Sequence, residues 1–351
     1  MESKTGFIVG TRPELIKISP IVKELNSVVI FTGQHYDKNM SEDFIKLLQC
    51  EDIIYIEKNK HIGENHLKNI SKKISEIISK RNIEKFVVQG DTNSTLAGSI
   101  AVKSEKKTLY FIESGMRSSE ISQIEEYNRL IVSHLADINL CNHESNKNNL
   151  INEGINPKKI FVSGSTVYAS ISNMKIPKEN TGTKTPYILL TLHRPENVDN
   201  LKELDLLLQS IDQLNKHVIF PIHPRTRKKL KGSMEKYKNI TFSEPVDYSN
   251  FLKLIQNSIF IISDSGGVQE EAAILRKPLL IPRAYTERPE MLNIFNLLTP
   301  NINTLKEESN KLLSGNSDIS ESVKSSELLY GENEVVKNIK NLLEKSTFIN
   351  N

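Results

Sequence analysis

The chain has 351 residues, of which 38% are hydrophobic and 25% are charged. This length exceeds what one ordinary core holds and suits two domains, and the composition is that of a globular protein. The 46 basic and 43 acidic side chains leave a net charge of +3, which creates no strong field toward nucleic acid or an anionic membrane. We therefore expect neither as a partner.

Targeting and redox signals are sparse. No apolar run approaches the roughly 18–20 residues that cross a bilayer, and no apolar signal segment follows Met1. Two cysteines, Cys50 and Cys141, are too few for a disulfide framework, and their simplest role is that of buried thiols. We expect a cytoplasmic protein.

Short apolar runs alternate with amphipathic, helix-length segments along the chain. In the first half the strand-like runs are Phe7–Val9, Val28–Phe31, Phe86–Val88, Leu109–Ile112, Ile138–Cys141 and Ile160–Val162. Segments such as Pro13–Leu25, Ser94–Val102 and Glu125–Leu135 separate them as predicted helices. In the second half the runs are Tyr187–Thr191, Val218–Phe220, Ile240–Phe242, Ile259–Ile262 and Leu279–Ile281. Apolar strands without polar alternation indicate parallel sheets covered by crossover helices on both faces.

A polar segment from Ile176 to Pro186, bracketed by prolines, divides the two halves and predicts a linker. The predicted fold is α/β, with two Rossmann-like, doubly wound parallel-sheet domains facing a cleft. We expect an N-terminal domain over residues 1–175 and a C-terminal domain over residues 176–330. In the remaining segment, 331–351, an amphipathic helix at Glu334–Glu344 is expected to pack back near the N-terminal domain.

Acidic residues follow the strands of the first half. Open α/β sheets bind ligands outside the carboxyl ends of their strands, and Asp91, Glu113 and Glu125 stand at or just beyond such ends. Separately, Asp91 could be a helix cap, and Glu125 could form an ion pair with Arg129 four residues later. Three carboxylates at one rim of a sheet favour acid/base chemistry.

The turn after the first strand carries cations. Its amides, together with Arg12 and Lys17, could hold an anion, although an ordinary strand-to-helix turn explains it equally well. The turn is neither G-x-G-x-x-G nor a Walker loop, so neither NAD nor a P-loop nucleotide site is predicted.

The strongest local signal lies in the second half. The segment Ser263-Asp264-Ser265-Gly266-Gly267 joins a buried strand to a helix. Ser265 and the amides of Gly266 and Gly267 can bind a pyrophosphate at the positive helix end. One turn later, Glu271 can accept hydrogen bonds from ribose hydroxyls.

Two histidines and a possible metal motif complete the candidates. His193 and His223 follow the first two strands of the second half, and His193 would point into the cleft. His61–His66 lacks the i,i+4 spacing of a helical zinc site, and no D-x-D sequence occurs. We predict neither a metal nor a cofactor.

Together these motifs resemble the UDP-N-acetylglucosamine 2-epimerase family, which has the glycosyltransferase-B fold of two Rossmann domains. The matching motifs are Gly10–Glu14, Thr32–Asp37, Gly90–Thr92, Glu113–Arg117, Glu125–Arg129, Phe161–Val167, His193–Asn197, Ser263–Glu271 and Thr286–Glu290. Each motif is weak alone, but their order and spacing are specific.

The resemblance implies a hidden elimination and re-addition. A base removes the C2 proton of UDP-GlcNAc while UDP leaves C1, giving a 2-acetamidoglucal. UDP then returns as a proton reaches the opposite face of C2, giving UDP-ManNAc. The positions matching the family's catalytic residues are Asp91, Glu113 and Glu125, with His193 assisting at the nucleotide. Which carboxylate is the base stays open.

The resemblance also implies binding residues and an assembly. The positions matching the family's UDP contacts are Arg12, Lys17, His223, Ser265, Gly266, Gly267 and Glu271. Arg129 would hold phosphate or orient Glu125. Members of the family are commonly homodimers, so we expect a homodimer here.

Departures from the family pattern keep other activities open. Gln34–Met40 differs where relatives bind a second, activating UDP-GlcNAc, Ile124 replaces a proline, and Met291–Leu298 differs in a stretch implied to lie near the sugar. The alternatives are a hydrolysing epimerase that releases ManNAc and UDP, a 2-epimerase of a modified UDP-hexosamine such as a 2,3-diacetamido uronate, and a glycosyltransferase of the same fold. A nucleotide-sugar-binding protein without catalysis would not need the carboxylates and His193.

Overall fold

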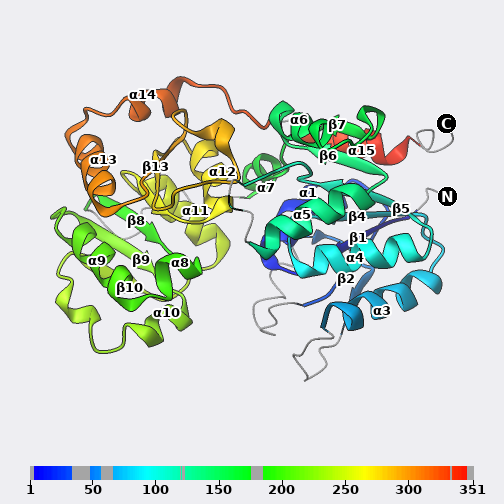
Figure 1. The fold of residues 1–351 in the computed structure, drawn as a ribbon, viewed down its shortest axis with the longest axis horizontal. Coiled ribbons are helices and arrows are strands. Elements are labelled where there is room, and N and C mark those ends of the chain that lie inside the picture. Colours follow the sequence, from blue (N-terminus) through cyan, green and yellow to red (C-terminus); the bar gives the residue numbers. More distant parts are fainter. Residues whose placement is uncertain are drawn as a thin grey trace. The chain divides into compact units, whose positions relative to one another are not determined.

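The computed structural model describes residues 4–33, 48–56, 66–118, 120, 123–174, 185–332 and 334–345. The chain forms two compact units (Figure 1). Unit 1 comprises Met1–Asn173 and Leu329–Asn351, and unit 2 comprises Met174–Leu328. Each unit is a parallel sheet with helices on both faces, which confirms the predicted fold class of two doubly wound α/β units.

In unit 1 the described strands form a seven-stranded sheet of order β3-β2-β1-β4-β5-β6-β7. The strands are β1 (Thr5–Val9), β2 (Ser27–Phe31), β3 (Ile53–Tyr55), β4 (Lys85–Gln89), β5 (Thr108–Ile112), β6 (Ile138–Cys141) and β7 (Ile160–Val162). The helices are α1 (Arg12–Val22), α3 (His66–Ser79), α4 (Asn93–Ser104), α5 (Ile124–Leu135), α6 (Glu144–Asn152), α7 (Val167–Asn173) and α15 (Val335–Glu344), with a short η1 (Pro157–Lys159). Because the strand order reverses between β1 and β4, the ends of these two strands flank the crevice where such folds bind ligands.

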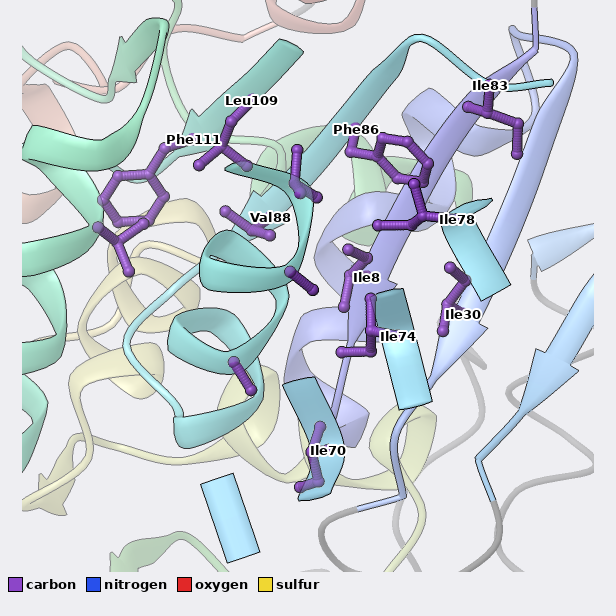
Figure 2. Close-up of a cluster of buried hydrophobic side chains, with 14 of the residues drawn as sticks. Ile8, Ile30, Ile70, Ile74, Ile78, Ile83, Phe86, Val88, Leu109 and Phe111 are labelled. Atoms are coloured by element: carbon purple, nitrogen blue, oxygen red, sulfur yellow. The ribbon is translucent and has the colours of Figure 1, made fainter. Parts of the chain in front are cut away.

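The core of unit 1 lies between the sheet and the layer of α3, α4 and α5. Figure 2 shows Ile8 of β1 and Phe86 of β4 surrounded by apolar side chains of α3, including Ile74. All three side chains are fully buried, and burying each contributes about 1.5–3 kcal/mol. At Gly98, α4 lies so close to β1 that an added Cβ would sit 2.8 Å from the Ile8 side chain.

In unit 2 the described strands form a six-stranded sheet of order β10-β9-β8-β11-β12-β13. The strands are β8 (Tyr187–Thr191), β9 (His217–Pro221), β10 (Ile240–Ser243), β11 (Ile261–Ser263), β12 (Leu279–Ile281) and β13 (Asn296–Leu298). The helices are α8 (Pro195–Val198), α9 (Leu201–Asp212), α10 (Pro224–Lys229), α11 (Tyr248–Asn257), α12 (Gly266–Ile274), α13 (Ile302–Ser314) and α14 (Asp318–Ser325), with η2 (Met234–Lys236) and η3 (Pro289–Met291). Here the strand order reverses between β8 and β11, so the ends of these two strands flank the equivalent crevice within unit 2.

The predicted strands are all present, and two further strands were missed. β3 and β13 are three-residue edge strands, too short to show a periodic pattern. β13 lies inside Met291–Leu298, the stretch implied to lie near the sugar. Met291 and Phe295 are buried in the core, and β13 pairs with β12. Several of the residues that differ from the family pattern in this stretch therefore pack in the core or pair in the sheet. The Gln34–Met40 segment, all of the His61–His66 segment except His66, and most of the linker lie outside the described residues.

The last helix, α15, packs on unit 1. It contacts α1, and the Lys85 Nζ donates to the carbonyl of Leu343 at 2.7 Å. The chain enters this region past Tyr330, whose carbonyl accepts from the amide of Ser165 at 2.8 Å. Among the described residues, no helix combines the length and apolarity needed to span a membrane.

Candidate active site

The first turn of α1 binds one of the chain's own carboxylates. Glu14 is 5% exposed, and its Oε2 accepts from the amides of Gly10 at 2.6 Å and Thr11 at 3.2 Å. Thr11 and Glu14 form a capping box, and the amides of Gly10 and Thr11 therefore already have an acceptor within the chain.

Burial has the largest effect on the pKa of Glu14 and raises it. Desolvation raises the pKa of this carboxyl to about 7, although hydrogen bonds from the amides of Gly10 and Thr11 and from the Thr92 hydroxyl oppose the rise. The negative charge of Asp91 raises the pKa further. Glu14 therefore changes its charge near neutral pH.

Glu113 lies at the end of β5 and forms an ion pair with Lys17. The Lys17 Nζ donates to its Oε1 at 2.6 Å, and their side chains are 15% and 6% exposed. Glu113 has φ +66°. This left-handed backbone conformation is unfavourable for residues other than glycine, and such residues are concentrated at functional sites. Two residues predicted for different roles, one catalytic and one for UDP, are thus direct partners.

Asp91 and Arg129 are also partners. The Arg129 Nη1 donates to the Asp91 Oδ2 at 2.5 Å, and the Asp91 backbone carbonyl accepts from the Asn128 side chain at 2.8 Å. The rest of the guanidinium binds the buried Glu126, with Nε and Nη2 at 3.0 and 2.5 Å from its Oε2. Arg129 therefore orients Asp91.

The predicted pairing of Arg129 with Glu125 is wrong. The i,i+3 neighbour Glu126 points inward and takes the guanidinium, whereas Glu125 is half-buried. Within the described part of the chain, the Glu125 side chain forms no hydrogen bond or ion pair. It lies in the first turn of α5, where the helix dipole favours a carboxylate.

In unit 2 the ends of β8 and β11 meet at a buried aspartate. Asp264 is fully buried, and its Oδ1 lies 2.9 Å from the His193 Nδ1. It also accepts from the amides of His193 and Arg194, at 3.1 and 3.0 Å, and from the Asn197 side chain at 3.0 Å. Burial opposes its ionisation, but these hydrogen bonds outweigh burial and lower the pKa of Asp264.

This aspartate fixes one histidine nitrogen. Since an ionised Asp264 only accepts, it selects the tautomer that carries a proton on Nδ1 of His193. The His193 side chain is 48% exposed, so the rest of the ring stays accessible. In the sequence Asp264 stands out only as part of the turn, and its pairing with His193 becomes recognisable once β8 and β11 are known to be neighbours in the sheet.

The Ser/Gly turn opens α12 as the sequence predicts. Ser265 is the N-cap residue and makes no side-chain capping bond, and Ser265, Gly266 and Gly267 are half-buried. A Cβ on Gly266 would lie 2.9 Å from the Arg288 Nη1. The glycine thus lets a guanidinium approach the positive end of the helix, where an anion would be stabilised by both.

The arginine beside this turn belongs to a buried charge cluster that the sequence analysis missed. Arg288 binds Glu270 through Nε and Nη2, at 2.9 and 2.6 Å. Glu287 accepts from Arg194 and Arg283 at 3.2 Å. Burial opposes ionisation of Glu287, but Arg283 and Arg194 lower its pKa to about 2. The partners of Arg283 and Arg288 could not be predicted from the sequence, because these contacts form only when the turn after β12 folds against α12.

The two predicted UDP contacts of unit 2 that lie outside this turn differ in environment. Glu271 is half-buried, and its Oε1 accepts from the Tyr248 hydroxyl at 2.8 Å. His223 is exposed at the end of β9.

A cavity of about 430 Å³ also opens on unit 2, lined by Asn197, Glu203 and Asn301 among others. None of the predicted UDP contacts lines this cavity.

The predicted residues thus form two groups, one in each unit. In unit 1, the ends of β1, β4 and β5 bring Asp91 and Glu113 to one edge of the sheet together with their cations, and α1 begins there at Arg12. In unit 2, the ends of β8 and β11 bring His193 and the glycine turn together. Carboxylates beside cations suit proton transfer, and a helix start beside arginines suits phosphate.

This fold and these residue groups define a class of two-unit, Rossmann-like α/β enzymes. Comparison with known proteins identifies the family. A family model described as UDP-N-acetylglucosamine 2-epimerase matches residues 21–344. The UDP-N-acetylglucosamine 2-epimerase of Methanocaldococcus jannaschii is 39% identical over 319 residues, covering 83% of this chain and 86% of that protein.

Two further comparisons bear on fold and substrate. The crystal structure of the M. jannaschii enzyme in complex with UDP-GlcNAc and UDP has a TM-score of 0.83 at 34% identity, covering 97% of this chain and 99% of that one. The UDP-2,3-diacetamido-2,3-dideoxy-D-glucuronate 2-epimerase of Pseudomonas aeruginosa is 32% identical over 302 residues, 81% of this chain and 84% of that protein. The chain belongs to the UDP-N-acetylglucosamine 2-epimerase family and is an enzyme of the isomerase class.

Proposed function

We propose that the protein is a non-hydrolysing UDP-N-acetylglucosamine 2-epimerase that interconverts UDP-GlcNAc and UDP-ManNAc. The observation that carries the proposal is the pairing of two carboxylates at one sheet edge with cations, Asp91 with Arg129 and Glu113 with Lys17. Membership of the family and the UDP-GlcNAc complex of the M. jannaschii relative support it.

The reaction is an anti elimination followed by re-addition. A carboxylate of unit 1 takes the C2 proton as the C1–O bond to UDP breaks, leaving a double bond between C1 and C2 of 2-acetamidoglucal. UDP then re-forms the bond to C1 while a protonated carboxyl delivers its proton to the other face of C2. Because one group cannot reach both faces, the reaction needs more than one of Asp91, Glu113 and Glu125.

The departing UDP needs a binding site with positive charge, which unit 2 supplies in this proposal. The amides at Gly266 and Gly267 and the helix dipole of α12 stabilise developing phosphate charge. His193, held by Asp264, assists at the same place, and His223 and Glu271 contribute further contacts to UDP. Arg12 and Lys17 are the corresponding candidates for UDP contacts within unit 1. The domains of the enzyme, 1–175 and 176–330 with a C-terminal helix, thus divide the work between acid/base chemistry and UDP binding.

Product analysis tests this function. Purified protein is incubated with UDP-GlcNAc, and the mixture is separated by anion exchange and identified by NMR. We expect UDP-ManNAc at equilibrium with UDP-GlcNAc and no accumulation of free sugar. Free ManNAc together with UDP would instead identify the hydrolysing epimerase. No new sugar of either kind would reject the proposal for this substrate.

A modified UDP-hexosamine is the second candidate substrate. It is favoured by the 32% identical relative named for a 2,3-diacetamido glucuronate and by the departure at Met291–Leu298. Parallel assays with UDP-GlcNAc and UDP-2,3-diacetamido-2,3-dideoxy-glucuronate decide between them. A kcat/KM at least tenfold higher for the uronate would replace the main proposal.

The proposal includes a homodimer in the cytoplasm. On α5 an apolar stripe is exposed at helical spacing, formed by Ile124, Tyr127 and Ile131 at 60%, 49% and 45% exposure, and a second copy of the chain would cover it. Light scattering should give twice the chain mass, and Ile131→Lys should reduce it to the mass of one chain.

The unpaired thiols Cys50 and Cys141 suit a reducing compartment. Cell fractionation tests the proposed cytoplasmic location.

A further inference from the structure

A third carboxyl group stands beside the two that the proposed reaction uses. Glu14 lies in the first turn of α1, is 5% exposed, and accepts from the Gly10 and Thr11 amides. A Cβ on Gly90 would lie 4.0 Å from the Glu14 Cγ and 3.8 Å from the Glu113 Oε2. Glu14 thus lies next to the turn that carries Asp91, with its carboxyl group turned back onto the amides of Gly10 and Thr11.

The cations near this group are already engaged. Glu113 binds Lys17 of α1, and Asp91 binds Arg129 of α5. Glu14 has no ion pair with any described residue. Three carboxyl groups therefore share an edge at which two cations form ion pairs, and the group without a cation, Glu14, is as buried as Glu113 and more buried than Asp91.

Physical chemistry assigns the proton to this third group. Removing an unpaired carboxylate from water is costly, and the buried Glu14 avoids that cost by staying neutral. Its other oxygen, Oε1, is buried and lacks a partner at full hydrogen-bond geometry among the described residues. Burial raises the pKa of Glu14 to about 7, and the charge of Asp91 adds to that rise.

We propose that Glu14 is a positioning residue that holds a proton beside the ion-paired Asp91 and Glu113, and that losing this proton slows the reaction. The second half of this inference rests on the proposed epimerase function. Proton abstraction from C2 and departure of UDP build negative charge on the substrate. A third anion at the same edge would raise the free energy of that transition state and compete for Arg129 and Lys17.

The variant Glu14→Gln separates charge from structure. Its amide oxygen can still accept from Gly10 and Thr11, but the side chain stays neutral at every pH. For the wild type, we expect kcat for epimerisation to fall with a midpoint near pH 7. A one-proton loss predicts a fall of roughly 30-fold at 1.5 pH units above the midpoint. In Glu14→Gln this fall should be absent, so the ratio of variant to wild-type kcat should rise more than tenfold between pH 6 and pH 8.5.

A matched control makes the same chemical change elsewhere in unit 1. Glu76 is exposed on α3, so Glu76→Gln should keep the wild-type pH profile. A Glu14→Gln profile with the wild-type midpoint would overturn the proposal, because Glu14 would then not be the titrating group.

Infrared spectroscopy tests the proton directly and does not depend on turnover. Wild type in deuterium oxide should show the C=O band of a protonated carboxyl at pH 6 that is lost by pH 8.5. The band should persist in Glu76→Gln and be missing from Glu14→Gln. If folded wild type lacks this band at pH 6, the proton-holding role is refuted. If the band titrates but the wild type epimerises no substrate at any pH, it is the proposed function that has failed.

Discussion

Asp264→Asn should destabilise unit 2 although the two side chains have nearly the same shape. Each oxygen of Asp264 meets donors: Oδ1 the His193 ring, and Oδ2 the Arg194 amide and the Asn197 side chain. An asparagine places an NH2 group against one of these sets. If the NH2 group faces Arg194, the buried Arg194 amide loses its acceptor even if the Asn197 side chain flips. If the NH2 group faces His193, the imidazole ring must take the tautomer that has no proton on Nδ1.

The size of the effect follows from these contacts. A hydrogen bond to a charged group contributes about 1.5–3 kcal/mol, and a buried donor without a partner costs about 1–3 kcal/mol. Because Asn197 or the histidine ring can adjust, we expect a loss of about 2–4 kcal/mol in the free energy of unfolding. The fall in kcat should be larger than any rise in KM, since His193 loses its orientation.

Urea unfolding followed by circular dichroism measures this loss, since the chain has no tryptophan. Asp247→Asn is the matched control, because Asp247 is an exposed N-cap of α11 whose oxygen accepts from the Asn250 amide at 2.9 Å. Asparagine caps helices nearly as well as aspartate, so this variant should change stability by less than about 0.5 kcal/mol. A loss below about 1 kcal/mol in Asp264→Asn would refute the reasoning about the buried donors.

Three other predictions concern both units. Asp91→Asn and Glu113→Gln should each lose most of the turnover while UDP still raises the melting temperature, and full activity in both would exclude the assigned roles. Gly266→Ala should cost about 1–3 kcal/mol and weaken UDP binding measured by calorimetry, because the new methyl group meets the Arg288 guanidinium; unchanged affinity would separate the turn from UDP. Burial raises the pKa of Glu14 from 4.5 to about 7, which corresponds to about 3 kcal/mol. That stability is complete below pH 4.5 and lost as pH rises through 7, so Glu14→Gln should flatten the fall in urea-derived stability between pH 5 and 8, and an equally steep fall in the variant would contradict the shift.

Much of the fold could be predicted because its signals are local. Apolar runs such as Tyr187–Thr191 and Leu279–Ile281 are buried central strands with the predicted bounds. β3 and β13 were missed because three residues are too few to show a periodic pattern, although β7, also a three-residue edge strand, was recognised from its apolar run. The glycine turn at Ser265–Gly267 was found because two glycines at a helix start have few structural explanations.

The pairing of charges could not be predicted, because it depends on which strands are neighbours and which helix face turns inward. The spacing of four between Glu125 and Arg129 suggested a partner, yet the helix turns Glu126 toward the guanidinium. Likewise, the sequence does not reveal that the Glu14 carboxyl group folds back onto the amides of Gly10 and Thr11. These contacts become visible only when the register of β1, β4 and β5 is known.

Solvent exchange at C2 tests the central claim most directly. The protein is incubated with UDP-GlcNAc in deuterium oxide, and the C2 position of product and recovered substrate is followed by proton NMR. The account predicts one deuterium at C2 of UDP-ManNAc and its progressive entry into recovered UDP-GlcNAc, because the C2 proton passes through a carboxyl group that exchanges with solvent. UDP-ManNAc that retains only hydrogen at C2, or no exchange in either sugar, would contradict it.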